Sequence, residues 1–155
     1  MGKKKAAEPD SLFLTGIPGI DDQHAEMIFM CDSILNRIKK ESPSQEVIDL
    51  SIQEIIGCFK SHIVTEENLL EMIGFPEAAV HKAEHKKIFS KLDKKKSELG
   101  ANKKAGFSRF VSSFRETIFN HIDVFDREYT VHIEKLMGLK KKYKITALKA
   151  QTLTD

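Results

Sequence analysis

The sequence has no tryptophan and only two cysteines, Cys31 and Cys58, which do not form a CxxC pair. With so few thiols, neither a disulfide framework nor a thiolate zinc site is encoded. Long hydrophobic runs are also missing. No apolar segment approaches the roughly 18 residues that a membrane crossing needs, and residues 1–10 lack the apolar stretch of a secretory signal. We therefore expect a protein without a membrane span, in a reducing, cytoplasmic compartment.

An excess of charge of one sign is absent as well. The chain carries 25 Lys and Arg against 23 Asp and Glu, a formal net charge of +2. This balance argues against a dedicated nucleic-acid-binding protein, which needs a basic excess to neutralise phosphates. A hydrophobic fraction of 41% and a charged fraction of 31% are typical of a globular protein, and 155 residues suffice for one domain.

Glycine and proline are scarce, with eight and four residues, and they cluster at a few positions. Between these positions apolar residues recur at spacings of three and four, the pattern of amphipathic helices. We expect four helices, at about 22–41, 43–73, 76–100 and 103–137. Joined by short loops, they can bury their apolar faces only against one another. The predicted fold is therefore all-α, an up-down-up-down antiparallel four-helix bundle.

Cap signals predict where the first two helices begin. Asp21 or Asp22 can cap the first helix, because a carboxylate accepts hydrogen bonds from the free N–H groups of the first turn. In the second helix, Ser42 suits the N-cap, Pro43 the first helical position and Gln45 the third position of a capping box.

The bundle should form one domain over residues 12–138. A flexible arm, residues 1–11, would precede it, and a basic tail or short helix, residues 139–155, would follow. Four lysines within residues 140–144 make this tail a candidate contact surface for a protein partner.

Every predicted helix carries histidine. Five of the six histidines, in chain order, are His24, His62, His81, His85 and His121. Residues four apart share one face of a helix, so both the His81–His85 pair and the His62–Glu66 pair can chelate an ion. If these faces point inward, five imidazoles converge. Buried imidazoles need partners, and a divalent metal supplies partners for all of them.

Carboxylates complete this candidate metal site. Glu66 and Asp126 would offset the metal charge, and the mixed donor set suits iron, manganese, zinc or copper. Asp126 follows His121 by five residues, about 140° around an ideal α-helix. A regular helix would not aim both side chains at one site, and Glu128, seven residues after His121, aligns better in angle but lies about 10 Å along the axis. If Asp126 is the ligand, as the spacing of the motif at residues 121–126 implies, a π-type turn or another local distortion between these residues must bring it round to the site.

Four motifs in order carry a family resemblance. They are the GIPGIDDQH segment ending at His24, the HxxxEE motif at residues 62–67, the HxxxH motif at residues 81–85, and the HIxxxD motif at residues 121–126. Together they resemble the hemerythrin family, in particular its bacterial members, whose fold is an up-down four-helix bundle.

The resemblance implies a non-haem di-iron centre with an oxo or hydroxo bridge. One iron would be held by His81, His85 and His121, the other by His24 and His62, with Glu66 and Asp126 bridging. Counting these ligands against two six-coordinate irons leaves one position open, on the iron with two histidines. The implied function is reversible O2 binding, as a carrier, store or delivery protein and not as an enzyme.

The chain also departs from the family pattern where an O2 pocket is expected. Many members have tryptophan four residues before the fourth-helix histidine, where this chain has Thr117, and phenylalanine after the second-helix histidine, where it has Ile63. Either neighbours fill the space and the Thr117 hydroxyl bonds to the carbonyl of residue 113 or 114, or a passage opens there. The expected pocket residues are Met27, Phe59, Ile63, Thr117 and Ile118.

Other functions stay open. A redox or peroxide-handling di-iron enzyme is one, and an O2-sensing or redox-sensing module is another. The carboxylate-rich, ferritin-like class is disfavoured, because no Glu in this sequence is followed three residues later by His.

For the other histidine, glutamate and cysteine side chains near the motifs we expect structural roles and not metal binding. Glu67 should face solvent, because it lies 100° from Glu66 on an ideal helix. His132 is too far along its helix to join the site and should pair with Glu128. Cys31 and Cys58 should serve as small core hydrophobes.

Overall fold

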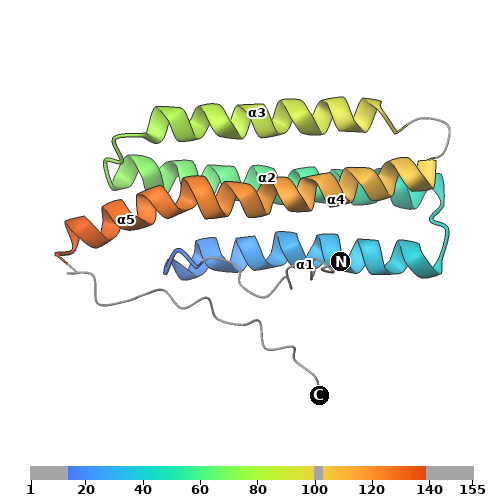
Figure 1. The fold of residues 1–155 in the computed structure, drawn as a ribbon, viewed down its shortest axis with the longest axis horizontal. Coiled ribbons are helices and arrows are strands. Elements are labelled where there is room, and N and C mark those ends of the chain that lie inside the picture. Colours follow the sequence, from blue (N-terminus) through green and yellow to red (C-terminus); the bar gives the residue numbers. More distant parts are fainter. Residues whose placement is uncertain (1–13, 100–102, 139–155) are drawn as a thin grey trace, which may run out of the picture.

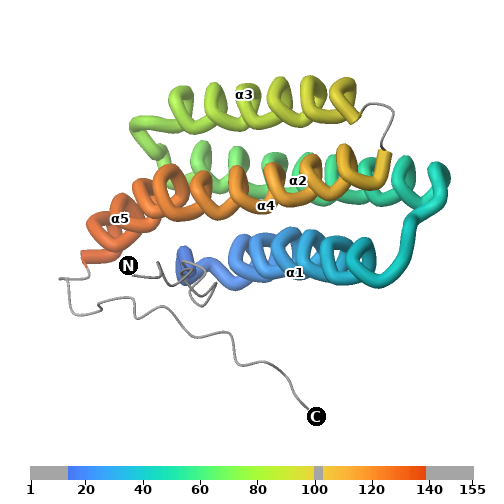
Figure 2. Tube along the Cα trace, turned by 45° about the vertical axis from the view of Figure 1, so that its right-hand side comes forward, coloured from blue at the N-terminus to red at the C-terminus, as the bar shows by residue number. Residues whose placement is uncertain are grey.

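The computed structural model describes residues 14–99 and 103–138, which fold into a bundle of four antiparallel helical rods (Figure 1). The rods are α1 (Pro18–Lys40), α2 (Gln45–Met72), α3 (Ala78–Ser97), and a fourth made of α4 (Lys103–His121), the π-helical turn η1 (Ile122–Asp126) and α5 (Arg127–Leu136). Figure 2 shows α4 running on into α5 as one rod. The predicted up-down-up-down bundle is confirmed. The expected arm 1–11 and tail 139–155 lie outside the described residues.

The start of α1 differs from the expectation. Ile17 is the N-cap and Pro18 the first helical residue, where its fixed φ is compatible with the helix. Asp21 lies inside the first turn, and its carboxylate accepts hydrogen bonds from Thr15 N, Thr15 Oγ1 and Gly16 N at 2.8, 2.8 and 3.0 Å. The prediction that Asp21 or Asp22 is the N-cap was wrong, because Asp21 ties the preceding segment to the helix instead.

The start of α2 also shifts, by two residues. Ser44 is the N-cap, and its hydroxyl accepts from Val47 N at 3.3 Å. The Gln45 amide donates to Asp49 Oδ1 at 2.8 Å instead of completing a capping box. The prediction of Ser42 as N-cap was wrong because the second serine has the extended backbone that the cap requires.

Apolar packing divides into two clusters along the bundle. The larger cluster draws on α1, α2, α3 and α4, and the smaller contains Leu70, Phe75 and Tyr129 at the opposite end. Along the bundle the predicted metal ligands lie where the segments that form the two clusters meet. The fold thus encloses a polar layer between two hydrophobic ones.

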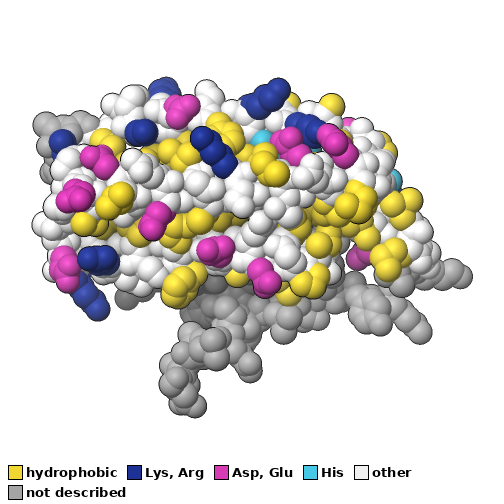
Figure 3. Space-filling view, turned by 180° about the vertical axis from the view of Figure 1, so that it is seen from behind, with side chains coloured by type: hydrophobic (Ala, Val, Ile, Leu, Met, Phe, Trp, Pro, Cys, Tyr) yellow, Lys and Arg dark blue, Asp and Glu magenta, His cyan; other side chains and the backbone are white. Residues whose placement is uncertain are grey.

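The surface carries both signs of charge. Acidic and basic side chains are interspersed over the face shown in Figure 3. Within the described ranges, no helix combines the length and the hydrophobicity that a membrane span requires.

Candidate metal centre

The seven predicted ligands meet in one buried cluster. His24 comes from α1, His62 and Glu66 from α2, His81 and His85 from α3, His121 from the end of α4, and Asp126 from η1. None is more than 3% exposed. They form three overlapping groups, and within each group the candidate ligand atoms lie within 4.8 Å of one another. The structure therefore brings together all the residues that the motifs singled out.

Glu66 lies at the middle of the cluster. Its Oε2 is 3.0 Å from His85 Nε2, 3.2 Å from His81 Nε2 and 3.3 Å from His62 Nε2. These histidines belong to two different helices. Glu66 therefore contacts both the predicted two-histidine set, through His62, and the predicted three-histidine set.

Asp126 makes the corresponding contacts from the fourth rod. Its oxygens lie 3.1 Å from His121 Nε2, 3.2 Å from His24 Nε2 and 3.3 Å from His81 Nε2. Each of the two carboxylates thus lies between histidines of both sets, as a bridging ligand would.

The π turn between His121 and Asp126 is confirmed. Residues 122–126 form a π-helix between α4 and α5. A wider turn absorbs one residue, so Asp126 takes the angular position that a residue four after His121 would have in a regular α-helix. This local distortion aims the Asp126 carboxylate inward, where it is 0% exposed.

Polar atoms in the cluster are left without partners by the protein itself. Throughout residues 14–99 and 103–138, the fully buried side-chain nitrogens and oxygens that lack a hydrogen bond all belong to this cluster, and they are on His24, His62, His81, His121 and Asp126. Such groups are costly to bury. A cation would satisfy the inward-facing atoms, and the imidazole and carboxylate donors suit a divalent transition metal. The residues present therefore fit a metal centre.

Electrostatics keep the two carboxylates ionised. Burial raises the pKa of Glu66, but hydrogen bonds from the surrounding histidines outweigh burial and hold this pKa well below its usual value. The pKa of Asp126 is also lowered, because its contacts with His121 and His24 outweigh the effects of burial and of Glu66. Burial lowers the pKa of His121, yet Asp126 and Glu66 raise it to about 10. The cluster therefore attracts positive charge, either protons or a metal that displaces them.

Glu67 does not point away into solvent as expected. Its Oε1 lies 3.0 Å from His85 Nδ1, and its side chain is 28% exposed. Lys82 Nζ lies 3.9 Å from the other Glu67 oxygen. The prediction was wrong because the rotation that separates Glu67 from Glu66 directs it to the neighbouring helix α3. Glu67 can hold the Nδ1–H of His85 and leave Nε2 facing the cluster.

Gln23 provides a second outer contact that the sequence analysis missed. Its Oε1 lies 3.3 Å from His62 Nδ1, while its Nε2 donates to Thr65 Oγ1 at 3.1 Å. The Thr65 hydroxyl donates in turn to the Ser61 carbonyl at 3.0 Å. This chain orients the amide so that its oxygen accepts from His62 Nδ1, which leaves Nε2 unprotonated for a metal. The sequence signal that could have identified Gln23 is its position directly before His24 in the first motif.

Tyr129 was missed as well. Its hydroxyl donates to Glu66 Oε1 at 2.8 Å, and the residue is 0% exposed. Burial and the charges of Glu66 and Asp126 raise the pKa of the phenol, so it keeps its proton.

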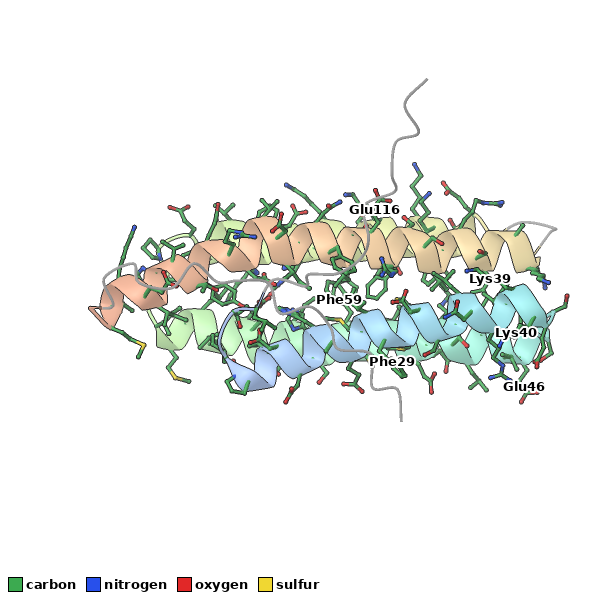
Figure 4. The ribbon with its side chains drawn as sticks, turned by 60° about the horizontal axis from the view of Figure 1, so that its bottom comes forward. Phe29, Lys39, Lys40, Glu46, Phe59 and Glu116 are labelled. Carbon is green, nitrogen blue, oxygen red and sulfur yellow. The ribbon has the colours of Figure 1, made fainter. Side chains whose placement is uncertain are left out.

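The expected pocket residues occupy the apolar side of the cluster. Met27, Phe59 and Ile118 are members of the larger hydrophobic cluster, and Ile63 packs against it. The Phe59 ring centroid lies 6.4 Å from that of His62 and 6.2 Å from that of His85. Figure 4 shows Phe59 inside the bundle.

The Thr117 hydroxyl bonds within its own helix, the first of the two expected alternatives. Its hydroxyl donates to the Ser113 carbonyl at 2.7 Å. Together with Ile88 and Phe114 it lines a cavity of about 10 Å³, enough for about one water molecule. The Thr117 side chain is half-buried and is bonded to the main chain of its own helix.

His132 lies outside the cluster, as predicted, but its expected pairing with Glu128 was wrong. His132 Nε2 lies 3.3 Å from the Ile73 carbonyl oxygen, and its ring centroid is 5.5 Å from that of Phe75. The helix rotation turns this imidazole toward the α2–α3 connection, where the carbonyl at the end of α2 needs a donor.

Both cysteines are free thiols in or against the larger hydrophobic cluster. Burial raises the pKa of Cys31 to about 12, whereas Cys58 is only half-buried and its pKa is raised less.

Because thiolates are the reactive form, we expect a thiol reagent at pH 8 to modify Cys58 slowly and to spare Cys31 in the native protein. Peptide mass spectrometry measures this. Unfolding should expose both thiols, and Cys58→Ser should abolish native labelling. Native modification of Cys31 would contradict the expectation.

An all-helical bundle that surrounds a buried histidine and carboxylate cluster defines a class of cation-binding proteins. Residues 15–131 match the family described as the hemerythrin HHE cation binding domain, and the chain belongs to this hemerythrin family. A bacteriohemerythrin of Stenotrophomonas maltophilia (strain R551-3) is 25% identical over 119 residues, which are 77% of this chain and 76% of the relative. No solved structure gives a significant match. The family resemblance carried by the motifs is thus confirmed.

Proposed function

We propose that this chain binds O2 reversibly, as a carrier, store or delivery protein, at a pair of non-haem irons. His81, His85 and His121 would hold one iron, and His24 and His62 the other. Glu66 and Asp126 would bridge the two, together with an oxo or hydroxo group. When bound, a ferrous pair supplies the electrons and the open position by which O2 is held.

One observation carries the assignment of two metals over one. Both Glu66 and Asp126 contact histidines of the two-histidine set and of the three-histidine set, at 3.0 to 3.3 Å. A single ion would not need two carboxylates that each face both sets of imidazoles. The name of the bacterial relative supports the same function.

The surrounding residues favour binding over further reaction. Gln23 and Glu67 hold His62 and His85 with Nε2 directed inward. Met27, Phe59, Ile63 and Ile118 form an apolar wall that keeps water and protons from the ligand, which slows its irreversible loss. Thr117 bonds within its own helix and would therefore contribute to this wall as a packed side chain.

The test is a spectroscopic cycle with the iron-loaded, full-length protein. The chain is reduced without oxygen, exposed to O2 and then deoxygenated, while metal content and visible absorption are measured. We expect iron-ligand charge-transfer absorption that appears with O2 and disappears on its removal. Absorption that does not reverse, with consumption of peroxide that depends on added substrate, would contradict reversible binding and favour a redox enzyme.

A further inference from the structure

Tyr129 links the smaller hydrophobic cluster to the proposed metal centre. Its ring packs against Phe75, with centroids 6.3 Å apart, and also lies 5.8 Å from the His81 ring. Its hydroxyl donates to Glu66 Oε1 at 2.8 Å. One side chain therefore contacts both the end of the bundle and a predicted bridging carboxylate.

The π turn that brings Asp126 inward also positions Tyr129. Tyr129 is eight residues after His121, which corresponds to about 80° around a regular α-helix. If η1 absorbs one residue, the effective separation is seven residues, or about 20°, on the same face as His121. The distortion thus places two side chains at the cluster, Asp126 and Tyr129.

The two oxygens of Glu66 have different surroundings. Oε2 faces Nε2 of His62, His81 and His85 at 3.0 to 3.3 Å. Oε1 instead accepts a hydrogen bond from the Tyr129 hydroxyl. That hydrogen bond fixes the rotation of the carboxylate and withdraws negative charge from Oε1.

We propose that Tyr129 is a positioning residue that orients Glu66 and makes Oε1 a weaker metal donor than Oε2. This proposal rests on the proposed di-iron function. It gives Tyr129 two measurable effects. The hydrogen bond retains the metals by holding the bridge in place, and it raises the reduction potential by lowering the negative charge on the bridge.

The test compares iron-loaded wild-type protein with Tyr129→Phe and Thr130→Val. Thr130 is a matched control because it is buried and its hydroxyl donates to the Asp126 main-chain oxygen at 3.0 Å, not to a ligand carboxylate. We expect iron loss to a chelator to be about tenfold faster in Tyr129→Phe, the effect of losing one charged hydrogen bond next to a ligand. Its midpoint potential should fall, because a more negative carboxylate favours the oxidised metals. Thr130→Val should match the wild type in both measurements.

If Tyr129→Phe does not fold, ring-fluorinated tyrosine at position 129 tests the same hydrogen bond. The sequence has only two tyrosines, so a Tyr143→Phe background limits the label to Tyr129. A more acidic phenol donates more strongly, so the midpoint potential should rise, opposite to the effect of removing the hydroxyl. A structural role alone would change unfolding without these opposite shifts.

Unchanged iron release and potential in Tyr129→Phe, or a potential that does not respond to fluorination, would overturn the role of Tyr129 while the wild type still binds two irons. Failure of the wild type to bind two irons would overturn the proposed function, and this proposal with it. Metal content of the wild type therefore separates the two results.

Discussion

Under the di-iron proposal, replacing His85 with alanine should reduce the iron content of the purified chain from two ions to fewer than one. His85 Nε2 lies 3.0 Å from Glu66 Oε2 and 3.1 Å from His121 Nε2, so the imidazole sits where three candidate donors converge. Its removal deletes one donor and leaves the buried Glu66 and the outer Glu67 each with one contact fewer. Metal analysis of protein made with iron available measures the effect.

His132→Ala is the matched control, because it removes an imidazole of the same protein that contacts the Ile73 carbonyl and the Phe75 ring instead of the cluster. Its iron content should equal that of the wild type. Equal loss in both variants would show that the ligand assignment is wrong. One metal per wild-type chain, or zinc in place of iron, would contradict the di-iron proposal.

Replacing Gly106 with alanine should lower the free energy of unfolding, although alanine is normally the better helix former. A Cβ atom at Gly106 would lie 2.1 Å from the Leu99 carbonyl oxygen and 2.9 Å from the Leu99 Cα, so the Leu99 backbone or α4 must move. Such overpacking costs about 1 to 3 kcal/mol. Denaturant unfolding followed by circular dichroism measures the change.

Gly57→Ala is the control, and its expected change in the free energy of unfolding has the opposite sign. Gly57 is exposed within α2, and a Cβ atom there would meet no other atom within 4 Å. Here alanine should stabilise the protein by about 0.5 to 1 kcal/mol, because it reduces the backbone entropy lost on folding. Changes of the same sign at both positions would show that the contact with Leu99 does not control the stability of Gly106→Ala.

The four-helix fold and the residues of the cluster could be predicted from local sequence patterns and motifs. Apolar spacing identified four helices, because an amphipathic face is a local, periodic property. The HxxxE and HxxxH spacings placed pairs of ligands on single faces for the same reason. The five-residue gap between His121 and Asp126, taken together with the motif, predicted a π-type turn or another local distortion, and the structure has a π turn there.

Local sequence did not decide the exact caps. Ser42 and Ser44 have the same side chain on either side of Pro43, and the selection of Ser44 depends on the backbone path of the whole loop between α1 and α2. Likewise aspartate is a favoured N-cap residue, but the Asp21 carboxylate accepts hydrogen bonds from the segment that precedes the helix.

The contacts around the predicted ligands could not be predicted in this way, because they cross from one helix to another. Glu67 reaches His85 from α2 to α3, Gln23 reaches His62 from α1 to α2, and Tyr129 reaches Glu66 from the fourth rod to α2. Each contact depends on how one helix is rotated against another and on which side chain occupies the facing position. Helical periodicity fixes the face of a residue within its own helix, but the partner across the interface is set by packing of the complete bundle.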